Sequence, residues 1–182
     1  MDIIEVDGKK MKSNIMFSAA QIQTRVQELG EKIAADYPAG TPITVLIILN
    51  GALLFAADLV RHLPHPTEIE TMRLQSYHGM ESTGIVSLVG TEPVHLKDKH
   101  VLVVEDIVDT GRSIKKLTEI LNKVGCASIR TACLLDKPKS HIENISVNYV
   151  GFSIGPNFVI GYGLDLDGLY RNLPYIAELT PA

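Results

Sequence analysis

Residues 101–113 read VLVVEDIVDTGRS, and this stretch decides the fold class. Its first four residues predict an apolar strand, which ends in two carboxylates, Glu105 and Asp106, with a third, Asp109, three residues later. A helix predicted from about residue 113 to residue 124 is introduced by Thr110, Gly111, Arg112 and Ser113. In open α/β sheets ligands bind beyond the carboxyl ends of the strands, so the acidic turn lies where a binding site is expected.

The segments on either side alternate between strand and helix patterns. Residues 43–49, ITVLIIL, are apolar and β-branched without alternation, which is typical of a strand buried on both faces of a parallel sheet. Further strands are predicted over residues 69–77, 84–89 and 128–135, and helices over residues 18–36 and 52–63. This order predicts an α/β fold, with a twisted, mainly parallel sheet flanked by helices.

The first helix has clear start and stop signals. Ser18 is the expected N-cap, and Gln21 three residues later completes a capping-box pattern. Pro38 and Gly40 end the helical periodicity.

The chain is predicted to form one domain over residues 1–182. Its core is expected over about residues 18–136. After residue 136 the sequence becomes rich in Gly, Pro and Asn, which predicts loops and short strands. We expect this part, residues 137–182, to form a small hood together with residues 1–17.

Composition excludes several classes of protein. The chain has 182 residues, of which 46% are hydrophobic and 21% charged, which is ordinary for a globular protein and wrong for a disordered one. Its 17 Lys and Arg against 21 Asp and Glu give a net charge of −4, which argues against nucleic acid as a partner. No apolar window has the length of a membrane helix. Cys126 and Cys133 are expected to be small buried residues in a reducing, cytoplasmic location.

The chemistry of the acidic turn suits a sugar phosphate. Gly111 allows a tight turn, and backbone N–H groups at a helix start attract anions. Thr110 and Ser113 add hydroxyl donors, while Glu105 and Asp106 can accept hydrogen bonds from a ribose diol. The alternative is a solvated acidic turn with an ordinary helix cap. We favour the binding site because strand, acid pair, third acid, Thr-Gly and helix occur in order.

This segment resembles the phosphoribosyl pyrophosphate (PRPP) binding motif of type I phosphoribosyltransferases. Four other segments narrow the resemblance to the hypoxanthine-guanine members of that family: LNG at 49–51, SYHGMESTG at 76–84, LLDKP at 134–138 and NFVIGYGLDLDGLYRNLPYI at 157–176. The resemblance spans almost the whole chain. It implies the type I phosphoribosyltransferase fold and transfer of a phosphoribosyl group from PRPP to a 6-oxopurine, with release of pyrophosphate.

The resemblance implies a role for each residue of the acidic turn. The turn from Asp109 to Ser113, with Arg112, would hold the 5′-phosphate of PRPP. Glu105 and Asp106 would hold the ribose hydroxyls, partly through Mg²⁺. Asp109 would act as the catalytic general base near the purine N7. The alternative for Asp109 is a helix N-terminal acid that only orders the turn.

On the pyrophosphate side the resemblance implies a binding turn, a clamp, a metal contact and a closing loop. The turn Leu49-Asn50-Gly51 would offer backbone N–H groups, and in relatives it often contains a non-proline cis peptide. Some relatives have Lys at its centre, so Asn50 removes a charge and favours a backbone role. The remaining residues implied here are Arg171 as a pyrophosphate clamp, Asp165 as a metal contact beside Glu105 and Asp106, and Ser76 and Tyr77 in a closing loop over 76–84.

On the purine side the resemblance places Lys137 against O6. Because an ammonium group only donates, it suits the O6 acceptor of hypoxanthine or guanine and opposes the amino group of adenine. Phe158 would stack on the base, and the backbone carbonyls of Val159 and Asp165 would accept from the 2-amino group of guanine. The alternative for residues 158–160 is a plain core strand.

Three further points stay open from the sequence. The resemblance implies a homodimer or a homotetramer, without deciding between them. A xanthine-preferring enzyme is one alternative function. A PRPP- or nucleotide-sensing regulator is another, although such a protein would need a basic face to bind nucleic acid, and no block of Lys and Arg occurs in this chain.

Overall fold

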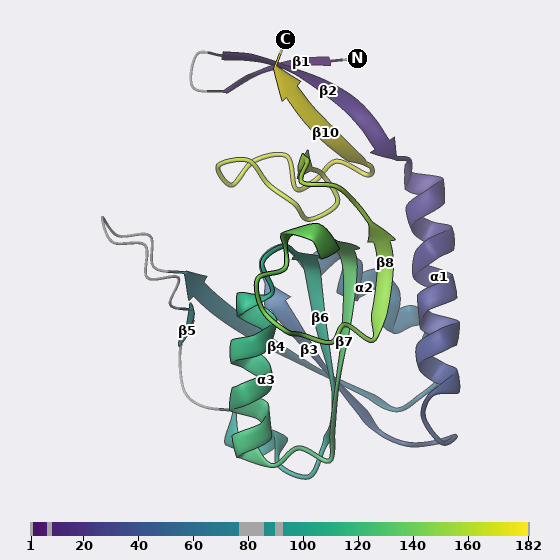
Figure 1. Cartoon of the computed structure of the whole chain (residues 1–182). Coiled ribbons are helices and arrows are strands. Elements are labelled where there is room, and N and C mark those ends of the chain that lie inside the picture. The colour runs from purple at the N-terminus through teal and green to yellow at the C-terminus, as the bar shows by residue number, and fades with distance from the viewer. Residues whose placement is uncertain (1, 7–8, 77–85, 90–92, 182) are drawn as a thin grey trace.

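The computed structural model describes residues 2–6, 9–76, 86–89 and 93–181. Its main element is a six-stranded sheet in the order β5-β4-β3-β6-β7-β8 (Figure 1). The strands are β3 (Ile43–Leu49), β4 (Thr67–Ser76), β5 (Val86–Val89), β6 (His100–Val108), β7 (Ser128–Asp136) and β8 (Tyr149–Ser153). All neighbours pair in parallel except β4 and β5, so the prediction of a mainly parallel sheet is confirmed.

The central strands are buried on both faces, as their apolar runs predict. In β3, Val45 and Ile47 belong to one hydrophobic cluster, and the intervening Leu46 and Ile48 belong to the other. Because side chains alternate across a strand, an uninterrupted apolar run supplies two cores at once.

Helices cover both faces of this sheet. The first cluster contains the buried residues of α1 (Ala19–Ala35) and α2 (Leu53–Leu59), and the second contains those of α3 (Arg112–Val124). In α3 the buried residues Ile114, Leu117 and Leu121 recur every three to four positions, which gives one apolar face. At the start of α1, Ser18 and Gln21 form the predicted capping box.

Two predicted helix and strand limits differ from the structure. The helix expected over residues 52–63 is α-helical only to Leu59 and continues as a 3₁₀ turn over Val60–His62. Pro64 follows closely and disfavours further helix. The strand expected to end at Val104 runs on to Val108, because Glu105, Ile107 and Val108 keep their pairing with β7.

A second, four-stranded antiparallel sheet lies beyond the carboxyl ends of the main strands (Figure 1). It has the order β1-β2-β10-β9 and contains β1 (Asp2–Val6), β2 (Lys9–Phe17), β10 (Ile176–Pro181) and β9 (Phe158–Ile160). It therefore joins the two ends of the chain. The C-terminal part of the expected hood differs at its start, because β8 belongs to the main sheet, where Tyr149 and Val150 pair with β7.

Candidate active site

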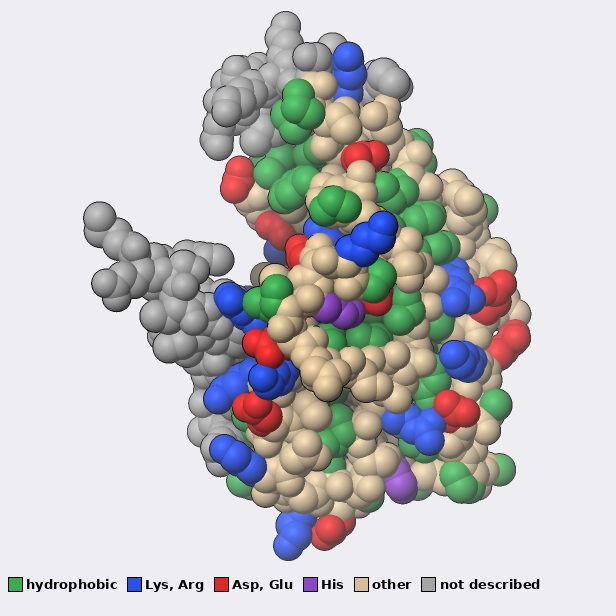
Figure 2. Space-filling model, viewed as in Figure 1, with side chains coloured by type: hydrophobic (Ala, Val, Ile, Leu, Met, Phe, Trp, Pro, Cys, Tyr) green, Lys and Arg blue, Asp and Glu red, His purple; other side chains and the backbone are tan. Residues whose placement is uncertain are grey.

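The acidic segment lies where the connections that leave the two central strands, β3 and β6, lead toward opposite edges of the main sheet. The chain leaves β3 through α2 toward β4 on one side, and it leaves β6 through α3 toward β7 on the other. Such a switch point opens a crevice at the carboxyl ends of the two central strands. The turns after β3 and β6 therefore meet there. In Figure 2 the surface is hollowed between the hood and the main body, and acidic and basic side chains gather in the hollow.

The turn after β6 has the backbone shape of an anion site. Gly111 is the N-cap of α3 with φ of 82°, a left-handed conformation that favours glycine, and no side chain caps the helix. The amide groups at the start of α3 are therefore left for another acceptor. Arg112 and Ser113 are half-buried, whereas Asp109 and Thr110 are exposed.

A later segment supports this turn from outside. The backbone N–H of Ile142 donates to the carbonyl of Thr110 at 3.2 Å. A Cβ added to Gly111 would lie 2.8 Å from Cδ1 of Ile145, and Lys115 of α3 pairs with Glu143 at 2.6 Å. Nothing in the local sequence of residues 142–145 indicates this contact with the turn.

The two carboxylates at the end of β6 are largely removed from water. Glu105 is buried and Asp106 half-buried. Burial and the adjacent Asp106 charge raise the pKa of Glu105 well above its usual range. Burial also raises the pKa of Asp106, and the Arg171 guanidinium opposes that rise. Within the described part of the chain neither carboxylate has an ion-pair partner within 4 Å, so the pair is a site prepared for cationic or hydroxyl donors.

Gly51 and Gly163 bring three distant segments into direct contact. A Cβ on Gly51 would lie 1.7 Å from Oδ2 of Asp106, and a Cβ on Gly163 would lie 2.0 Å from the carbonyl oxygen of Gly51. Side chains would not fit at either position. The loop after β9 therefore packs backbone to backbone on the turn after β3, and the Asp106 carboxylate at the end of β6 packs on the backbone of the same turn. The Leu49–Asn50 peptide bond in this turn is cis.

The loop after β9 carries the predicted clamp and metal contact. Arg171 donates to the carbonyl of Gly163 at 2.5 Å and pairs with Asp165 at 2.8 Å. Asp165 also accepts from the backbone N–H of Gly168 at 2.8 Å. Both predicted residues therefore lie in one loop, which rests on the turn at Gly51.

Lys137 and Asp109 face each other across the ends of β7 and β6. The Lys137 ammonium lies 3.1 Å from Oδ2 of Asp109, and the Lys137 side chain is only 10% exposed. Gly111 is the N-cap of α3 and no side chain makes a cap hydrogen bond there, so Asp109 does not cap this helix. Beside Lys137, the buried Asp136 pairs with His141 at 2.7 Å, a contact that the sequence reasoning did not anticipate.

The aromatic candidate on β9 is not a core residue. Phe158 is 51% exposed, whereas Val159 and Ile160 next to it are buried. A large apolar side chain left exposed at the end of a hood strand is available to a planar ligand.

The turn at Asn50 contains a cation that the sequence reasoning missed. Arg73 of β4 donates to Oδ1 of Asn50 at 3.0 Å, so a guanidinium lies directly beside this turn. Of the predicted lid, Ser76 is the last residue of β4, while Tyr77 and the rest of the loop to residue 84 lie outside the described residues.

The predicted metal contacts do not form one protein cage. In the described ranges, no three His, Cys, Asp or Glu side chains lie close enough to hold a metal ion together. Glu105 and Asp106 are adjacent on β6, and Asp165 is engaged by Arg171 on the loop after β9.

Comparison with known proteins agrees with this geometry. The phosphoribosyl transferase domain family matches residues 18–167. The hypoxanthine-guanine phosphoribosyltransferase of Lactococcus lactis is 39% identical over 98% of this chain and 97% of its own length. The chain belongs to the phosphoribosyltransferase family, in its hypoxanthine-guanine branch.

Solved structures support this assignment. A hypoxanthine phosphoribosyltransferase from Staphylococcus aureus superposes with a TM-score of 0.86 at 39% identity, covering 92% of this chain and 91% of that one. A hypoxanthine-guanine phosphoribosyltransferase from Bacillus anthracis gives a TM-score of 0.85 at 34% identity, covering 93% of this chain and 99% of that one. The fold is thus the type I phosphoribosyltransferase fold that the motifs imply. No helix in the described part of the chain has the length and apolarity to cross a membrane.

Proposed function

We propose that the protein is a purine salvage enzyme that transfers the 5-phosphoribosyl group of PRPP to hypoxanthine or guanine. The products are IMP or GMP and pyrophosphate. The observation that carries this proposal is the buried Lys137 ammonium, 3.1 Å from Asp109 and beside the anion turn at the start of α3. A donor that reads O6, an acid that accepts a proton and a phosphate site thus lie in one place.

The turn from Asp109 to Ser113 would bind the 5′-phosphate through the free amide groups at the start of α3 and the hydroxyls of Thr110 and Ser113. Glu105 and Asp106 would hold the ribose hydroxyls. In the reaction the bond from C1′ to the pyrophosphate oxygen breaks, the bond from C1′ to the purine nitrogen forms, and the purine gives up its N7 proton. The positive charge that develops at C1′ would be stabilised by the acidic pair beside it.

Asp109 and Lys137 would act on two neighbouring atoms, N7 and O6, on the same edge of the base. A 6-oxopurine that accepts from Lys137 at O6 and donates its N7 proton to Asp109 would bridge the two groups. Asp109 would then be the general base. Adenine would place an amino donor against the buried ammonium, which loses a hydrogen bond and leaves a charge unsatisfied. Phe158 would stack on the purine, and the carbonyls of Val159 and Asp165 would accept from the 2-amino group of guanine.

Pyrophosphate would leave on the side of the Leu49-Asn50-Gly51 turn. Backbone amides of this turn, together with Arg171, would hold it, since a planar guanidinium matches two phosphate oxygens. We add Arg73 to this group, because Asn50 holds its guanidinium at the turn. Ser76 and Tyr77 would contact the pyrophosphate when the loop closes and excludes water.

The acidic pair also fits Mg²⁺. Two carboxylates that share a buried strand end, with no ion-pair partner among the described residues, offer the hard oxygen ligands that Mg²⁺ prefers, and substrate oxygens and water would complete the shell. Glu105 and Asp106 would face the ion on the ribose side, and Asp165 would contact it or its water on the pyrophosphate side. The chemistry that the ion supplies when bound is charge neutralisation on the leaving pyrophosphate.

We further propose that the protein is a cytoplasmic homodimer or homotetramer without nucleic-acid or membrane partners. The free thiols of Cys126 and Cys133 are consistent with a reducing compartment. Leu53 and Leu54 on α2 are 47% and 37% exposed, and Ile69 on β4 is 56% exposed. Such side chains are candidates for burial between subunits.

The experiment that tests the proposed reaction uses the purified chain with PRPP, Mg²⁺ and each of hypoxanthine, guanine, xanthine and adenine. We expect IMP and GMP to form and adenine to be rejected. A preference for xanthine would move the protein to the alternative enzyme. If no purine gives a nucleotide, the proposed function is wrong.

A further inference from the structure

The loop that carries Asp165 and Arg171 packs on the core through Leu164 and is hydrogen-bonded to α2 by a buried hydroxyl. Tyr162 is 8% exposed, and its hydroxyl donates to Oδ2 of Asp58 on α2 at 2.6 Å. Its φ of 48° is left-handed, which is uncommon for an aromatic residue. Burial and Asp58 both raise the Tyr162 pKa, so the hydroxyl keeps its proton and remains a donor.

Tyr162 directly precedes Gly163, the residue at which this loop touches the Leu49-Asn50-Gly51 turn, called the pyrophosphate turn below. Gly163 packs on the carbonyl of Gly51 so closely that a Cβ would lie 2.0 Å from it. Gly163 also exchanges hydrogen bonds with Arg171, through its N–H to the Arg171 carbonyl at 2.9 Å and through its own carbonyl. A shift of Tyr162 would therefore move Gly163 away from the turn and carry Arg171 with it.

Asp58 is connected to the same turn through the chain itself. It lies on α2, whose first residue, Leu53, follows the turn at Gly51 by two positions. The Tyr162–Asp58 bond thus joins two segments that both touch Gly51, although the residues are 104 positions apart in sequence.

Resting on the proposed function, we propose that Tyr162 and Asp58 are positioning residues for the pyrophosphate side of the active site. Their hydrogen bond sets the distance between the turn at Gly51 and the loop that presents Arg171. They do not touch substrate. They act by holding the Gly163–Gly51 contact, on which the geometry of Arg171 depends.

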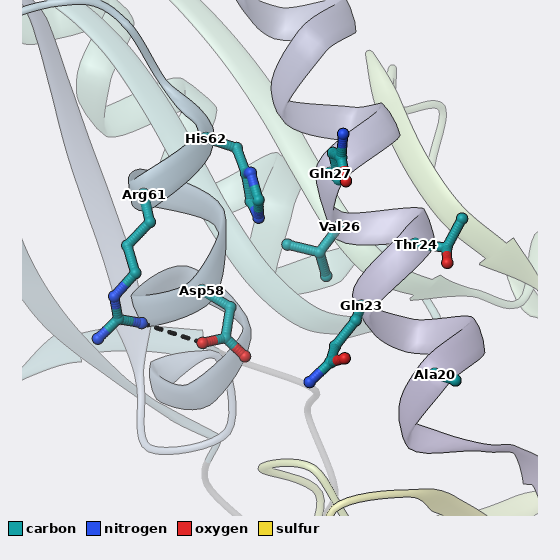
Figure 3. Close-up of a pocket in the computed structure, with 8 residues that line it drawn as sticks. All are labelled: Ala20, Gln23, Thr24, Val26, Gln27, Asp58, Arg61 and His62. Carbon is teal, nitrogen blue, oxygen red and sulfur yellow. Dashed lines mark hydrogen bonds and ion pairs between the residues drawn. The ribbon is translucent and has the colours of Figure 1, made fainter.

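The other oxygen of Asp58 provides an internal control. Oδ1 of Asp58 pairs with Arg61 at 3.0 Å, and both side chains line a cavity of about 480 Å³ between α1 and α2 (Figure 3). In Figure 3 the Arg61 side chain extends along its own helical segment, and its only drawn contact is with Asp58. The Arg61 side chain is mostly exposed, so removing it tests the ion pair without touching the bond to Tyr162.

A matched tyrosine exists elsewhere in the chain. The Tyr149 hydroxyl donates to Oδ2 of Asp36 at 2.7 Å, and its ring is buried. Tyr149 begins β8 and Asp36 caps the C-terminus of α1, so this pair lies at the amino end of the sheet, away from the site. The same hydroxyl accepts from Arg130 at 2.6 Å. Tyr149→Phe therefore removes the bond to Asp36 and the bond from Arg130, without affecting the loop at Gly163.

The test measures the KM for PRPP, the inhibition constant of pyrophosphate and the Kd for IMP in five variants. We expect Tyr162→Phe and Asp58→Ala to raise the two pyrophosphate-side constants about threefold to tenfold, the range that one lost hydrogen bond produces, and to leave the Kd for IMP within about twofold. Tyr149→Phe and Arg61→Gln should leave all three constants within about twofold. Asp58→Asn, whose amide oxygen still accepts, should restore the wild-type values.

Three results would overturn the inference. They are equal effects of Tyr162→Phe and Tyr149→Phe, equal changes in the constants for pyrophosphate and IMP, and failure of Asp58→Asn to differ from Asp58→Ala. Thermal unfolding of each variant confirms that folded protein is compared. A wild-type enzyme that makes no nucleotide would instead contradict the proposed function, whereas an active wild type with an unselective Tyr162→Phe variant would contradict this inference alone.

Discussion

At the scale of single residues, the site depends on charges held where water is scarce. Lys137 is nearly buried and has Asp109 as its described ion-pair partner. A buried ammonium that loses its partner is costly, so a ligand that draws Asp109 away must itself offer an acceptor. The O6 atom of a 6-oxopurine is such an acceptor, and the amino group of adenine is not. We therefore expect base selectivity to depend on this ion pair.

We expect Lys137→Ala to lower kcat/KM for hypoxanthine by about 10²-fold, because an oriented charged hydrogen bond to O6 is lost. The ratio of adenine to hypoxanthine turnover should rise, since the ammonium no longer opposes the amino group. Competition kinetics with the two bases measures this ratio. An unchanged ratio would remove Lys137 from the purine site.

Asp109→Asn should lower kcat by about 10²-fold or more, the usual contribution of a general base, while the KM for PRPP changes little. The amide keeps the size of the side chain but accepts no proton. Steady-state kinetics with hypoxanthine at saturating PRPP measures the effect. Equal losses in kcat and in PRPP affinity would argue for a binding role instead.

The raised pKa of Glu105 has a consequence for stability. Between the usual glutamate pKa near 4.5 and the raised value in the folded protein, the folded state binds more protons than the unfolded state. Unfolding free energy therefore falls as pH rises through that interval. We expect Glu105→Gln to raise the Tm more at pH 8 than at pH 5, by about 2–4 °C for each kcal/mol recovered. A pH-independent change in Tm would contradict this assignment.

At the scale of elements, the site depends on close approach between backbones. Gly163 has φ of 101° and meets the Gly51 carbonyl, whereas Gly40 has φ of 78° with nothing near its missing Cβ. The two glycines share the conformational requirement and differ in the steric one. A side chain at Gly40 would introduce backbone strain alone, whereas a side chain at Gly163 would also push against the turn at Gly51.

Gly163→Ala should therefore raise the KM for PRPP by about tenfold or more and destabilise the protein, since a buried clash against backbone typically costs about 1–3 kcal/mol. Gly40→Ala should lower the Tm through its φ alone and leave the KM unchanged. The two variants are compared by calorimetry and by kinetics. Similar KM values for both would show that the Gly163–Gly51 contact does not shape the site.

Elements with one dominant local signal were predictable from the sequence. The apolar run ITVLIIL matches β3 residue for residue, and Ser18 with Gln21 marks the start of α1. The end of β6 was not predictable, because Glu105 and Asp106 resemble a turn although the strand continues through them and pairs with β7 at Glu105, Ile107 and Val108. These two polar residues belong to the candidate site and do not mark the end of the strand.

At the scale of the whole molecule, the fold brings separate motifs to one edge of the sheet. The turns at Asn50, Asp109 and Lys137 follow β3, β6 and β7, whose parallel order places their carboxyl ends side by side. The motif order along the chain therefore predicted which turns lie together at this edge of the sheet. Contacts such as Arg73 with Asn50 and Tyr162 with Asp58 could not be predicted, since side-chain pairing between distant segments leaves no periodicity in the sequence.

The hood supplies Phe158 and the loop that bears Arg171, which the main sheet does not carry. Strand β10 pairs with both β2 and β9, so the two ends of the chain together support the exposed Phe158 and the loop that bears Arg171. Phe158 on the purine side and Arg171 on the pyrophosphate side of the proposed site thus depend on the same small sheet, while the phosphate turn depends on the main sheet and on residues 142–145.

A crystal structure of the protein with IMP, Mg²⁺ and pyrophosphate tests this arrangement most directly. We expect the 5′-phosphate on the amides at the start of α3, O6 on Lys137 and pyrophosphate between the Gly51 turn and Arg171. A nucleotide bound with its phosphate away from residues 105–113, or with its base remote from Lys137, would contradict the account.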